Sequence, residues 1–467
     1  MASVTHDPAA DAARRDRAFL GHPIGLAYLS FAEAWERFSY YGMLSLLTLY
    51  LTTQLLLPGH VENVAGMAGL RGVIESLRGP LSVTAFATQI AGLYGGLVYL
   101  TPILGGLVAD RALGRKRTVT IGAVAMACGH FLMALEMPFL LALLCLLIGV
   151  GFFKGNIASQ VGALYRPGDK RLASAFQIYY VGITASVILA PLVCGTLGET
   201  VGWHWGFGAA GIGMLIGLVV YLAGSAHLPA DPLLERRQGR GGAAPGLRKG
   251  EGKRLVLLVL LLPVMALGVT GNQQLYVTYP AWIDRSADLV LFGREMPRTW
   301  LLSIDAITST GLLIGSVMFW RWWSKTRKEP SEIAKTGLGY LISVAGVASL
   351  AIGAHVAELA GTKVHLGFLL AFHVLNSVGF SNAFPAALAL YARLSPPALA
   401  ATMMGIFYLQ FFAASNLAGL LGGYLEKMPG SQFWGLHAAM VGFAGVVVLI
   451  VRQRFGHLLQ ASDPVPP

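Results

Sequence analysis

Two glutamates and an arginine stand close together inside a long apolar segment near the start of the chain. In the stretch "FAEAWERFSYYG" they are Glu33, Glu36 and Arg37, and Tyr40 and Tyr41 follow them. A spacing of i, i+3, i+4, i+7 and i+8 predicts that these five side chains lie on one face of a helix. A charged side chain near the centre of a membrane costs at least about 2.5–3.5 kcal/mol on insertion scales, so these residues indicate a functional site.

Two interpretations of these charges are open at this point. In the first, Glu33 and Arg37 form an i,i+4 ion pair that only neutralises itself. That arrangement leaves Glu36 without a partner and does not account for Lys154, a cation in a later apolar segment. In the second, two carboxylates face two cations in a proton-coupled site. Protonation of a carboxylate would then release a cation to attract a substrate carboxylate or to open a gate, and we favour this interpretation.

The composition indicates that these charges lie in a membrane protein. Of the 467 residues, 55% are hydrophobic and 12% are charged, about half the charged fraction of a soluble globular protein. Apolar stretches of about 20 residues recur along the chain, each long enough to cross roughly 30 Å of hydrocarbon. The three cysteines, Cys128, Cys145 and Cys194, all fall in such stretches, so neither a disulfide framework nor a metal site is expected. The sequence predicts an all-α polytopic membrane protein.

We expect twelve membrane-spanning helices in two bundles of six. Their predicted ranges are 24–55, 85–109, 118–135, 139–164, 172–195, 204–224, 254–282, 299–323, 334–355, 365–393, 401–425 and 431–451. A segment rich in Gly, Pro and charge, 225–253, predicts a cytoplasmic linker between an N-terminal bundle of 24–224 and a C-terminal bundle of 254–451. Cytoplasmic tails of 1–23 and 452–467 complete the predicted organisation. A central binding site between the two bundles follows from this division.

Basic residues determine the expected orientation. They concentrate in alternate connections, such as "DRALGRKR", "RPGDKR" and "RWWSKTRK", which the positive-inside rule places in the cytoplasm together with both termini. The start of the chain lacks the apolar core of a secretory signal, so the first helix is expected to direct insertion itself. The net charge of +11 therefore indicates topology and an attraction to anionic lipids rather than nucleic-acid binding. We expect a monomer in a bacterial-type inner membrane.

Five stretches of the chain resemble the proton-dependent oligopeptide transporter (POT) family within the major facilitator superfamily. They are "EAWERFSYYG", "LVYLTPILGGLVADRALGRKR", "FFKGNIASQVGALY", "YYVGITASVILAPL" and "MMGIFYL". The resemblance implies the major facilitator fold and proton-coupled symport by alternating access, importing di- and tripeptides or peptide-like solutes. It implies no cofactor other than a proton gradient, and no enzymatic activity.

The resemblance also implies roles for individual residues. Glu33, Glu36 and Lys154 would couple transport to protons. Arg37, Lys154 and Tyr41 would hold the carboxylate end of a peptide. The full set of candidate substrate-binding residues is Arg37, Tyr40, Tyr41, Tyr99, Lys154, Asn156, Thr184, Gln274, Asp305 and Phe380. A cytoplasmic gating loop would contain Asp110, Arg111, Gly114 and Arg115.

The chain departs from the family pattern where the amino terminus of a peptide would bind. Thr184 and Asp305 stand where family members have asparagines, and Phe380 stands where they have a glutamate. Asp305 could replace the missing acid as an anchor for a substrate ammonium group. It could equally be a structural partner of Lys154 or cap a helix end. The altered clamp keeps open a proton-coupled transporter of a non-peptide carboxylate, or an exporter.

A non-transport membrane sensor or enzyme is the weakest alternative. The sequence contains no HExxH motif, nucleophile elbow, phosphate loop or Cys/His cluster. Polar residues on the later spans are expected to form hydrogen bonds between helices more often than to contact substrate. They are Asn272, Gln273, Gln274, His373, Asn376, Asn382, Gln410 and Asn416.

Overall fold

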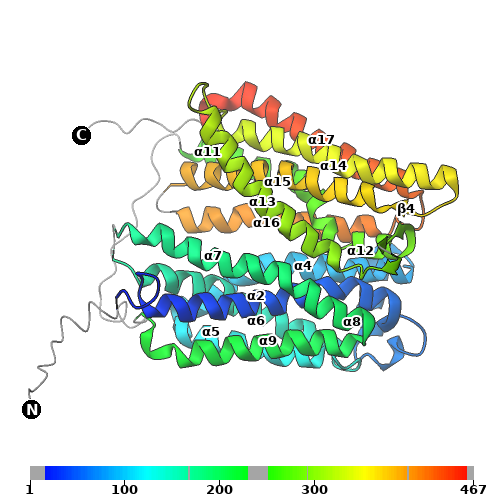
Figure 1. The fold of residues 1–467 in the computed structure, drawn as a ribbon, viewed down its shortest axis with the longest axis horizontal. Helices are drawn as coiled ribbons and strands as arrows, with labels where there is room; N and C mark the ends of the chain where they lie inside the picture. The colour runs from blue at the N-terminus through cyan, green and yellow to red at the C-terminus, as the bar shows by residue number, and fades with distance from the viewer. Residues whose placement is uncertain (1–15, 167–168, 230–250, 292, 397–398, 460–467) are drawn as a thin grey trace, which may run out of the picture. The chain divides into compact units, whose positions relative to one another are not determined.

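The computed structural model describes residues 16–166, 169–229, 251–291, 293–396 and 399–459. Most of the predicted N-terminal tail, most of the predicted linker and the end of the predicted C-terminal tail lie outside the described residues. Figure 1 shows that the described chain consists mainly of long helices.

Each of the twelve segments predicted to span the membrane contains a long helix. In the first half of the chain these helices are α2 (Ile24–Tyr50), α4 (Val83–Val108), α5 (Arg115–Leu132), α6 (Phe139–Ala163), α7 (Arg171–Ala190) and α9 (Trp203–Ala223). In the second half they are α11 (Glu251–Gln273), α13 (Trp300–Trp323), α14 (Glu332–Ala360), α15 (Leu366–Leu394), α16 (Ala400–Gly422) and α17 (Gly430–Phe455). Within the described residues, ten of the helices are long and apolar enough to cross a membrane. The remaining two long ones are α2, which carries the opening charges, and α5, which begins with three basic residues. The predicted all-α fold is confirmed.

Short elements connect these helices. The short helices are α3 (Met67–Arg78), α8 (Thr196–Thr200) and α12 (Tyr279–Ser286). The π-helical turns are η1 (Leu51–Leu55), η3 (Ala109–Leu113) and η4 (Pro191–Gly195), and the 3₁₀ turns are η2 (Val61–Asn63), η5 (Ser225–His227), η6 (Gln274–Tyr276) and η8 (Gly456–Leu459). Four two-residue strands, which the sequence did not predict, form a parallel pair and a hairpin. The parallel pair is β1 (Ala287–Asp288) with β4 (Val364–His365), and the hairpin is β2 (Val290–Leu291) with β3 (Arg294–Glu295).

Two of the predicted helices are interrupted. After α7 the chain continues at Pro191 into the π-helical turn η4, because proline has no N–H to donate to the regular ladder. The predicted range 254–282 is divided between α11 and α12 by the turn η6. Pro280 lies in the first turn of α12, where its missing N–H leaves no hydrogen bond unmade.

Internal contacts divide the chain into two compact units. The first contains residues 1–43 and 101–241, and the second contains residues 44–100 and 242–467. The division falls inside α2 and inside α4, whereas the prediction assigned both helices whole to the N-terminal bundle. The boundaries of the two predicted bundles stay a prediction.

Glycines permit close helix contacts within each unit. In the first unit, a Cβ on Gly105 of α4 would lie 1.9 Å from the carbonyl oxygen of Gly151 of α6. In the second unit, a Cβ on Gly339 of α14 would lie 2.5 Å from the carbonyl oxygen of Gly379 of α15. Small residues at such crossings let helix backbones approach where a membrane supplies little hydrophobic driving force.

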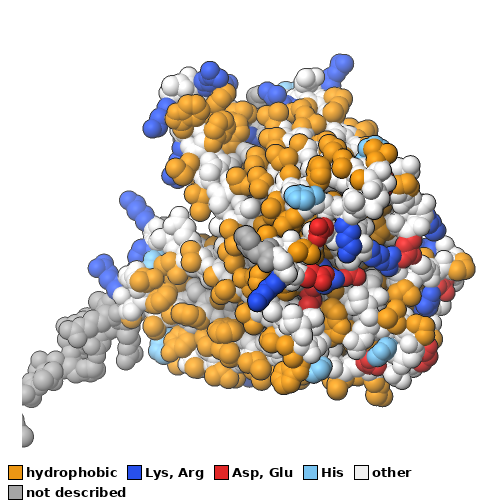
Figure 2. Space-filling view, turned by 45° about the vertical axis from the view of Figure 1, so that its right-hand side comes forward, with side chains coloured by type: hydrophobic (Ala, Val, Ile, Leu, Met, Phe, Trp, Pro, Cys, Tyr) orange, Lys and Arg blue, Asp and Glu red, His pale blue; other side chains and the backbone are white. Residues whose placement is uncertain are grey.

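Large apolar side chains cover the outer surfaces of the helices. Figure 2 shows hydrophobic side chains over much of the visible face, with acidic side chains gathered toward the right of the view. Exposed examples include Leu104, Val219, Leu260 and Met318. Apolar surface on this scale fits helices that face lipid rather than water.

Candidate functional site

Glu33, Glu36 and Arg37 form one buried cluster on α2. Their exposed fractions are 3%, 0% and 4%. The Arg37 Nε–H donates to Glu36 Oε2 at 2.5 Å, and Glu33 Oε1 lies 3.1 Å from the same nitrogen. The expectation that an i,i+4 pair leaves Glu36 without a partner is wrong, because the arginine side chain turns toward the adjacent glutamate. The single hydrogen of Nε bonds Glu36, and Glu33 lies beside the same nitrogen as an ion-pair partner.

Three charged atoms of this cluster remain unsatisfied. Among the described residues, no hydrogen-bond partner meets Glu33 Oε2, Glu36 Oε1 or Arg37 Nη2, although all three atoms are buried. An unmet buried polar group costs about 1–3 kcal/mol, and more when it is charged. A purely structural ion pair would be expected to satisfy these atoms. The arrangement instead suits a group that binds a proton or a ligand atom.

Two tyrosines of α2 pack around the arginine. The Arg37 guanidinium carbon lies 5.4 Å from the centre of the Tyr40 ring, within cation–π range. The Tyr40 and Tyr41 rings meet edge to face with their centres 5.1 Å apart. Tyr41 also lies within electrostatic range of Arg37. The predicted grouping of these residues with the α2 charges is therefore present in the structure.

Residues of α6 and α7 complete the cluster. Lys154 of α6 is half-buried and lies within electrostatic range of Glu33, Glu36 and Arg37. Tyr179 of α7 is 4% exposed and lies within electrostatic range of Glu33. Sequence reasoning assigned Tyr179 no role, although it begins one of the stretches that resemble the family. The structure thus joins two acids, two cations and three tyrosines within the first unit.

Asn156 and Thr184 lie on the same helices as Lys154 and Tyr179. The Asn156 Nδ2 donates to the carbonyl oxygens of Gly105, at 3.3 Å, and Phe152, at 2.8 Å. Asn156 therefore holds α6 against α4. Thr184 is half-buried on α7, one turn beyond Tyr179.

The predicted gating loop lies at the junction of α4 and α5. Asp110 and Arg111 belong to the π-helical turn η3, and Arg115 begins α5. Between them, Gly114 has φ 78° and ψ 162°, a conformation that is available essentially to glycine alone. Its N–H donates to the Ala109 carbonyl at 3.0 Å, which turns the chain tightly into α5.

Tyr99 and Phe380 share one aromatic cluster in the second unit. Tyr99 stacks on Phe411 with ring centres 5.1 Å apart, and Phe380 stacks on Phe384 at 5.3 Å. Phe384 meets Phe411 edge to face at 5.6 Å, which joins the two stacks. The structure therefore brings together two candidate residues that are far apart in the sequence.

The polar residues of the later spans bind mainly to other helices, as predicted. Gln274 is fully buried, and its Nε2 lies 2.7 Å from His437 Nε2, while its Oε1 accepts from the Thr278 N–H. Asn376 donates to Asn272 at 3.2 Å. Gln273 donates to Ser415, and the Asn382 Oδ1 accepts from Ser316 and Trp320, so these two residues also join different helices. Gln410 and Asn416 depart from the prediction, because their amides donate to carbonyls of their own helix.

Asp305 pairs with a histidine. Its Oδ1 lies 2.9 Å from His373 Nδ1, and the Tyr279 hydroxyl lies 3.0 Å from His373 Nε2. The alternative in which Asp305 caps a helix end is wrong, because Asp305 lies inside α13, beyond the N-terminal residue Trp300. The sequence predicts His373 only as a polar residue between helices and assigns no role to Tyr279.

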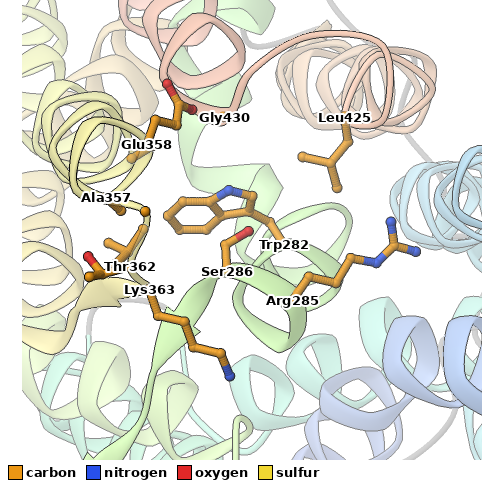
Figure 3. A pocket seen from close by; sticks show the side chains of 12 residues that line it. Trp282, Arg285, Ser286, Ala357, Glu358, Thr362, Lys363, Leu425 and Gly430 are labelled. Atoms are coloured by element: carbon orange, nitrogen blue, oxygen red, sulfur yellow. The ribbon is translucent and has the colours of Figure 1, made fainter.

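A pocket of about 380 Å³ opens at one end of the second unit, beside α12 and β4. Figure 3 shows the Trp282 indole in its middle, with the charged ends of Arg285 and Lys363 pointing away from the ring. Arg285 donates to Glu426 at 2.7 Å, and Glu358 accepts from the Ser431 N–H at 2.9 Å. None of the predicted substrate-binding residues lines this pocket.

Comparisons with known proteins identify the family. The model of the PTR2 (POT) family matches residues 116–236. The chain is 28% identical to the peptide transporter YePEPT of Yersinia enterocolitica, over 93% of this chain and 95% of that protein. It is 30% identical to the uncharacterized transporter YclF of Bacillus subtilis, over 93% of this chain and 94% of that protein.

A solved structure shares the fold. The crystal structure of peptide transporter POT in complex with sulfate superposes with a TM-score of 0.81 at 25% identity, covering 98% of this chain and all of that one. The predicted major facilitator fold is thereby confirmed, and the chain is an integral membrane transporter rather than an enzyme. Similarity along nearly the whole chain to relatives and structures of one kind leads to a single conclusion: this protein belongs to the POT family of transporters.

Proposed function

We propose that the protein is a proton-coupled symporter that imports di- and tripeptides or peptide-like solutes by alternating access. One observation carries the proposal: Glu33 and Glu36 both pair with Arg37 in a buried site within electrostatic range of Lys154. The similarity to a peptide transporter over most of the chain supports the choice of substrate.

The chemistry follows from the charge balance. With both glutamates ionised, the two carboxylates neutralise Arg37 and Lys154 and hold the four side chains together. A proton that binds one carboxylate removes a negative charge and leaves a cation in excess. The excess charge attracts the carboxylate end of a peptide, so proton binding and substrate binding favour each other. Release of both into the cytoplasm restores the ion pairs.

Individual residues take parts in this scheme. Arg37, Lys154 and Tyr41 hold the substrate carboxylate, while Glu33 and Glu36 exchange protons. The pocket wall is assigned to Tyr40, Tyr99, Thr184 and Phe380, and the substrate ammonium group to Asp305. Asn156 and Gln274 contribute by holding their helices in register, because their amides bind protein groups. Asp110, Arg111, Gly114 and Arg115 form the cytoplasmic gating loop.

The location and organisation proposed for the chain follow from its charges. We assign it to the inner membrane of a bacterial-type cell, with both termini in the cytoplasm because the basic connections alternate along the sequence. It works as a monomer of two bundles, 24–224 and 254–451, with membrane lipids and protons as its other partners.

Uptake into proteoliposomes tests the proposal. An inward proton gradient should drive concentrative uptake of a radiolabelled dipeptide by the wild-type protein. Glu33→Gln, Glu36→Gln and Lys154→Gln should each lose gradient-driven uptake while dipeptide exchange persists. Glu75→Gln is the matched control, since Glu75 binds Arg71 at 2.9 Å on the surface helix α3. Full concentrative uptake in all three site variants would contradict the mechanism.

A second candidate function keeps the fold and the proton coupling but changes the substrate to a non-peptide carboxylate. It is favoured by the departures at Thr184, Asp305 and Phe380. A competition panel of dipeptides, N-acetylated dipeptides and small carboxylates separates the two. Competition by the small carboxylates alone supports the second function.

A further inference from the structure

Three polar side chains from three helices, Asp305, His373 and Tyr279, form a hydrogen-bonded triad in the second unit. Asp305 Oδ1 of α13 lies 2.9 Å from His373 Nδ1 of α15, and His373 Nε2 lies 3.0 Å from the Tyr279 hydroxyl of α12. His373 is fully buried, Tyr279 is 1% exposed, and the Asp305 side chain keeps 13% of its surface exposed. Of the three residues in this triad, only Asp305 therefore reaches out of the protein interior.

The triad accommodates either protonation state of the His373 imidazole without the movement of a heavy atom. In the neutral ring, Nδ1–H donates to Asp305, and Nε2 accepts from the Tyr279 hydroxyl. In the protonated ring, Nδ1–H still donates to Asp305, and Nε2–H donates to the Tyr279 oxygen, which can also accept. A proton can enter and leave this site while every ring nitrogen keeps its partner.

Asp305 is the group that balances the positive charge of a protonated His373. Among the described residues, Asp305 is the one ionic partner that His373 contacts. From α14, Ser349 and the Gly346 backbone approach α15 and carry no charge. The buried His437 of α17 binds Gln274 and the Phe433 carbonyl. The pair thus carries one negative charge when the imidazole is neutral and none when it is protonated.

We propose that Asp305 and His373 form a second proton-binding site, whose proton competes with the ammonium group of a substrate for the Asp305 carboxylate. The inference rests on the proposed function. Both cations stabilise the same carboxylate, so each weakens the binding of the other. The exposed edge of Asp305 is where an ammonium group reaches it, and His373 acts from behind as a positioning and charge-setting residue. This competition is opposite in sign to the cooperation between proton and substrate carboxylate at Glu33 and Glu36.

Comparing two ligands isolates this site. Dialanine carries both a carboxylate and an ammonium group, whereas N-acetyl-dialanine lacks the ammonium group. The ratio of their dissociation constants is measured by calorimetry with the full-length purified protein between about pH 5 and pH 7, where the peptide amine stays protonated. This ratio cancels the pH dependence of the carboxylate end. In the wild type, the preference for dialanine should fall at least about tenfold as the pH is lowered, in line with the loss of one charged hydrogen bond.

Variants test which residues set that ratio. His373→Gln should retain the preference for dialanine at every pH, and Asp305→Asn should abolish it. Tyr279→Phe removes a hydrogen bond from both states of the ring, but the bond to the charged ring is the stronger, so the transition should move to lower pH. His437→Gln, a second buried histidine, should behave as the wild type. If His373→Gln unfolds, as thermal melting would show, the shift in Tyr279→Phe still decides the question.

The outcomes separate this inference from the function on which it rests. A wild-type protein that neither binds nor transports any peptide contradicts the proposed function. A protein that transports dialanine but whose ligand ratio is independent of pH, or is equally dependent in His373→Gln, contradicts only the second proton site.

Discussion

Arg37 and Glu36 are neighbours in the sequence, yet their side chains join at 2.5 Å inside α2, while Glu33, one turn earlier, lies 3.1 Å from the same arginine nitrogen. The arginine therefore bridges two acids. A lysine at this position would bring a point charge and could not reproduce the geometry of the guanidinium.

The first prediction concerns Arg37→Lys. Loss of the planar donor group should raise the KM for dipeptide by about tenfold or more, because hydrogen bonds to charged groups are worth roughly 1.5–3 kcal/mol. The measurement is counterflow uptake at several substrate concentrations. Arg71→Lys, on the surface helix α3, should leave KM unchanged. An unaltered KM in Arg37→Lys would show that the guanidinium does not hold substrate.

A second prediction concerns the crossing of α14 and α15. In Gly339→Ala, the new methyl group would lie 2.5 Å from the Gly379 carbonyl oxygen, so the helices must separate. We expect a loss of about 1–3 kcal/mol, the usual cost of overpacking. Thermal melting in detergent measures it. Gly311→Ala in α13 is the control, because nothing lies within 4 Å of its position, and equal melting temperatures for the two variants would rule out the predicted contact.

The third prediction concerns the turn into α5. Gly114→Ala forces a side chain into a backbone conformation that costs about 1–3 kcal/mol. The proposed gating loop should lose its shape, so both the melting temperature and the uptake rate should fall. Gly106→Ala, nearby on α4 with open space around it, should affect neither. If Gly114→Ala transports and melts like the wild type, the loop does not depend on this turn.

A fourth prediction concerns pH and the end of α16. Burial alone would raise the pKa of Glu426, but hydrogen bonds from Ser82, Thr84 and Arg285 outweigh it and lower the pKa below the usual 4.5. A carboxyl with a lowered pKa stabilises the folded state at pH values above its ordinary range, and this contribution disappears as the pH falls through the folded value. Melting curves of wild type and Glu426→Gln should therefore differ at pH 7 and converge as the pH falls through the lowered pKa of Glu426. A difference that persists in acid would assign the effect to something other than ionisation.

The sequence alone predicts the positions of the long helices and the grouping of the charged residues on α2. Each of the twelve predicted ranges overlaps a long helix, and among the described residues ten of these helices are apolar over the length that a membrane crossing needs. The grouping of Glu33, Glu36 and Arg37 followed from helical spacing. The pairing of Glu36 with Arg37 did not, since it depends on the rotamer of one long side chain.

Contacts between distant segments were beyond the sequence. His373 contacts Asp305 and Tyr279 only because three helices pack together, and local sequence patterns do not predict such packing. The position of Tyr179 beside the α2 charges could not be predicted for the same reason, although Tyr179 begins a stretch that resembles the family. The break between α11 and α12 also escaped prediction, because residues 274–278 contain neither glycine nor proline to mark it.

The most direct test of the central claim is the movement of protons with peptide. Proteoliposomes containing the full-length protein and a trapped pH indicator, at equal pH on both sides and with the membrane potential clamped, receive external dialanine. Coupled symport predicts acidification of the interior that depends on dialanine and is absent in Glu33→Gln and Glu36→Gln. Dialanine uptake without acidification would contradict proton coupling through this site.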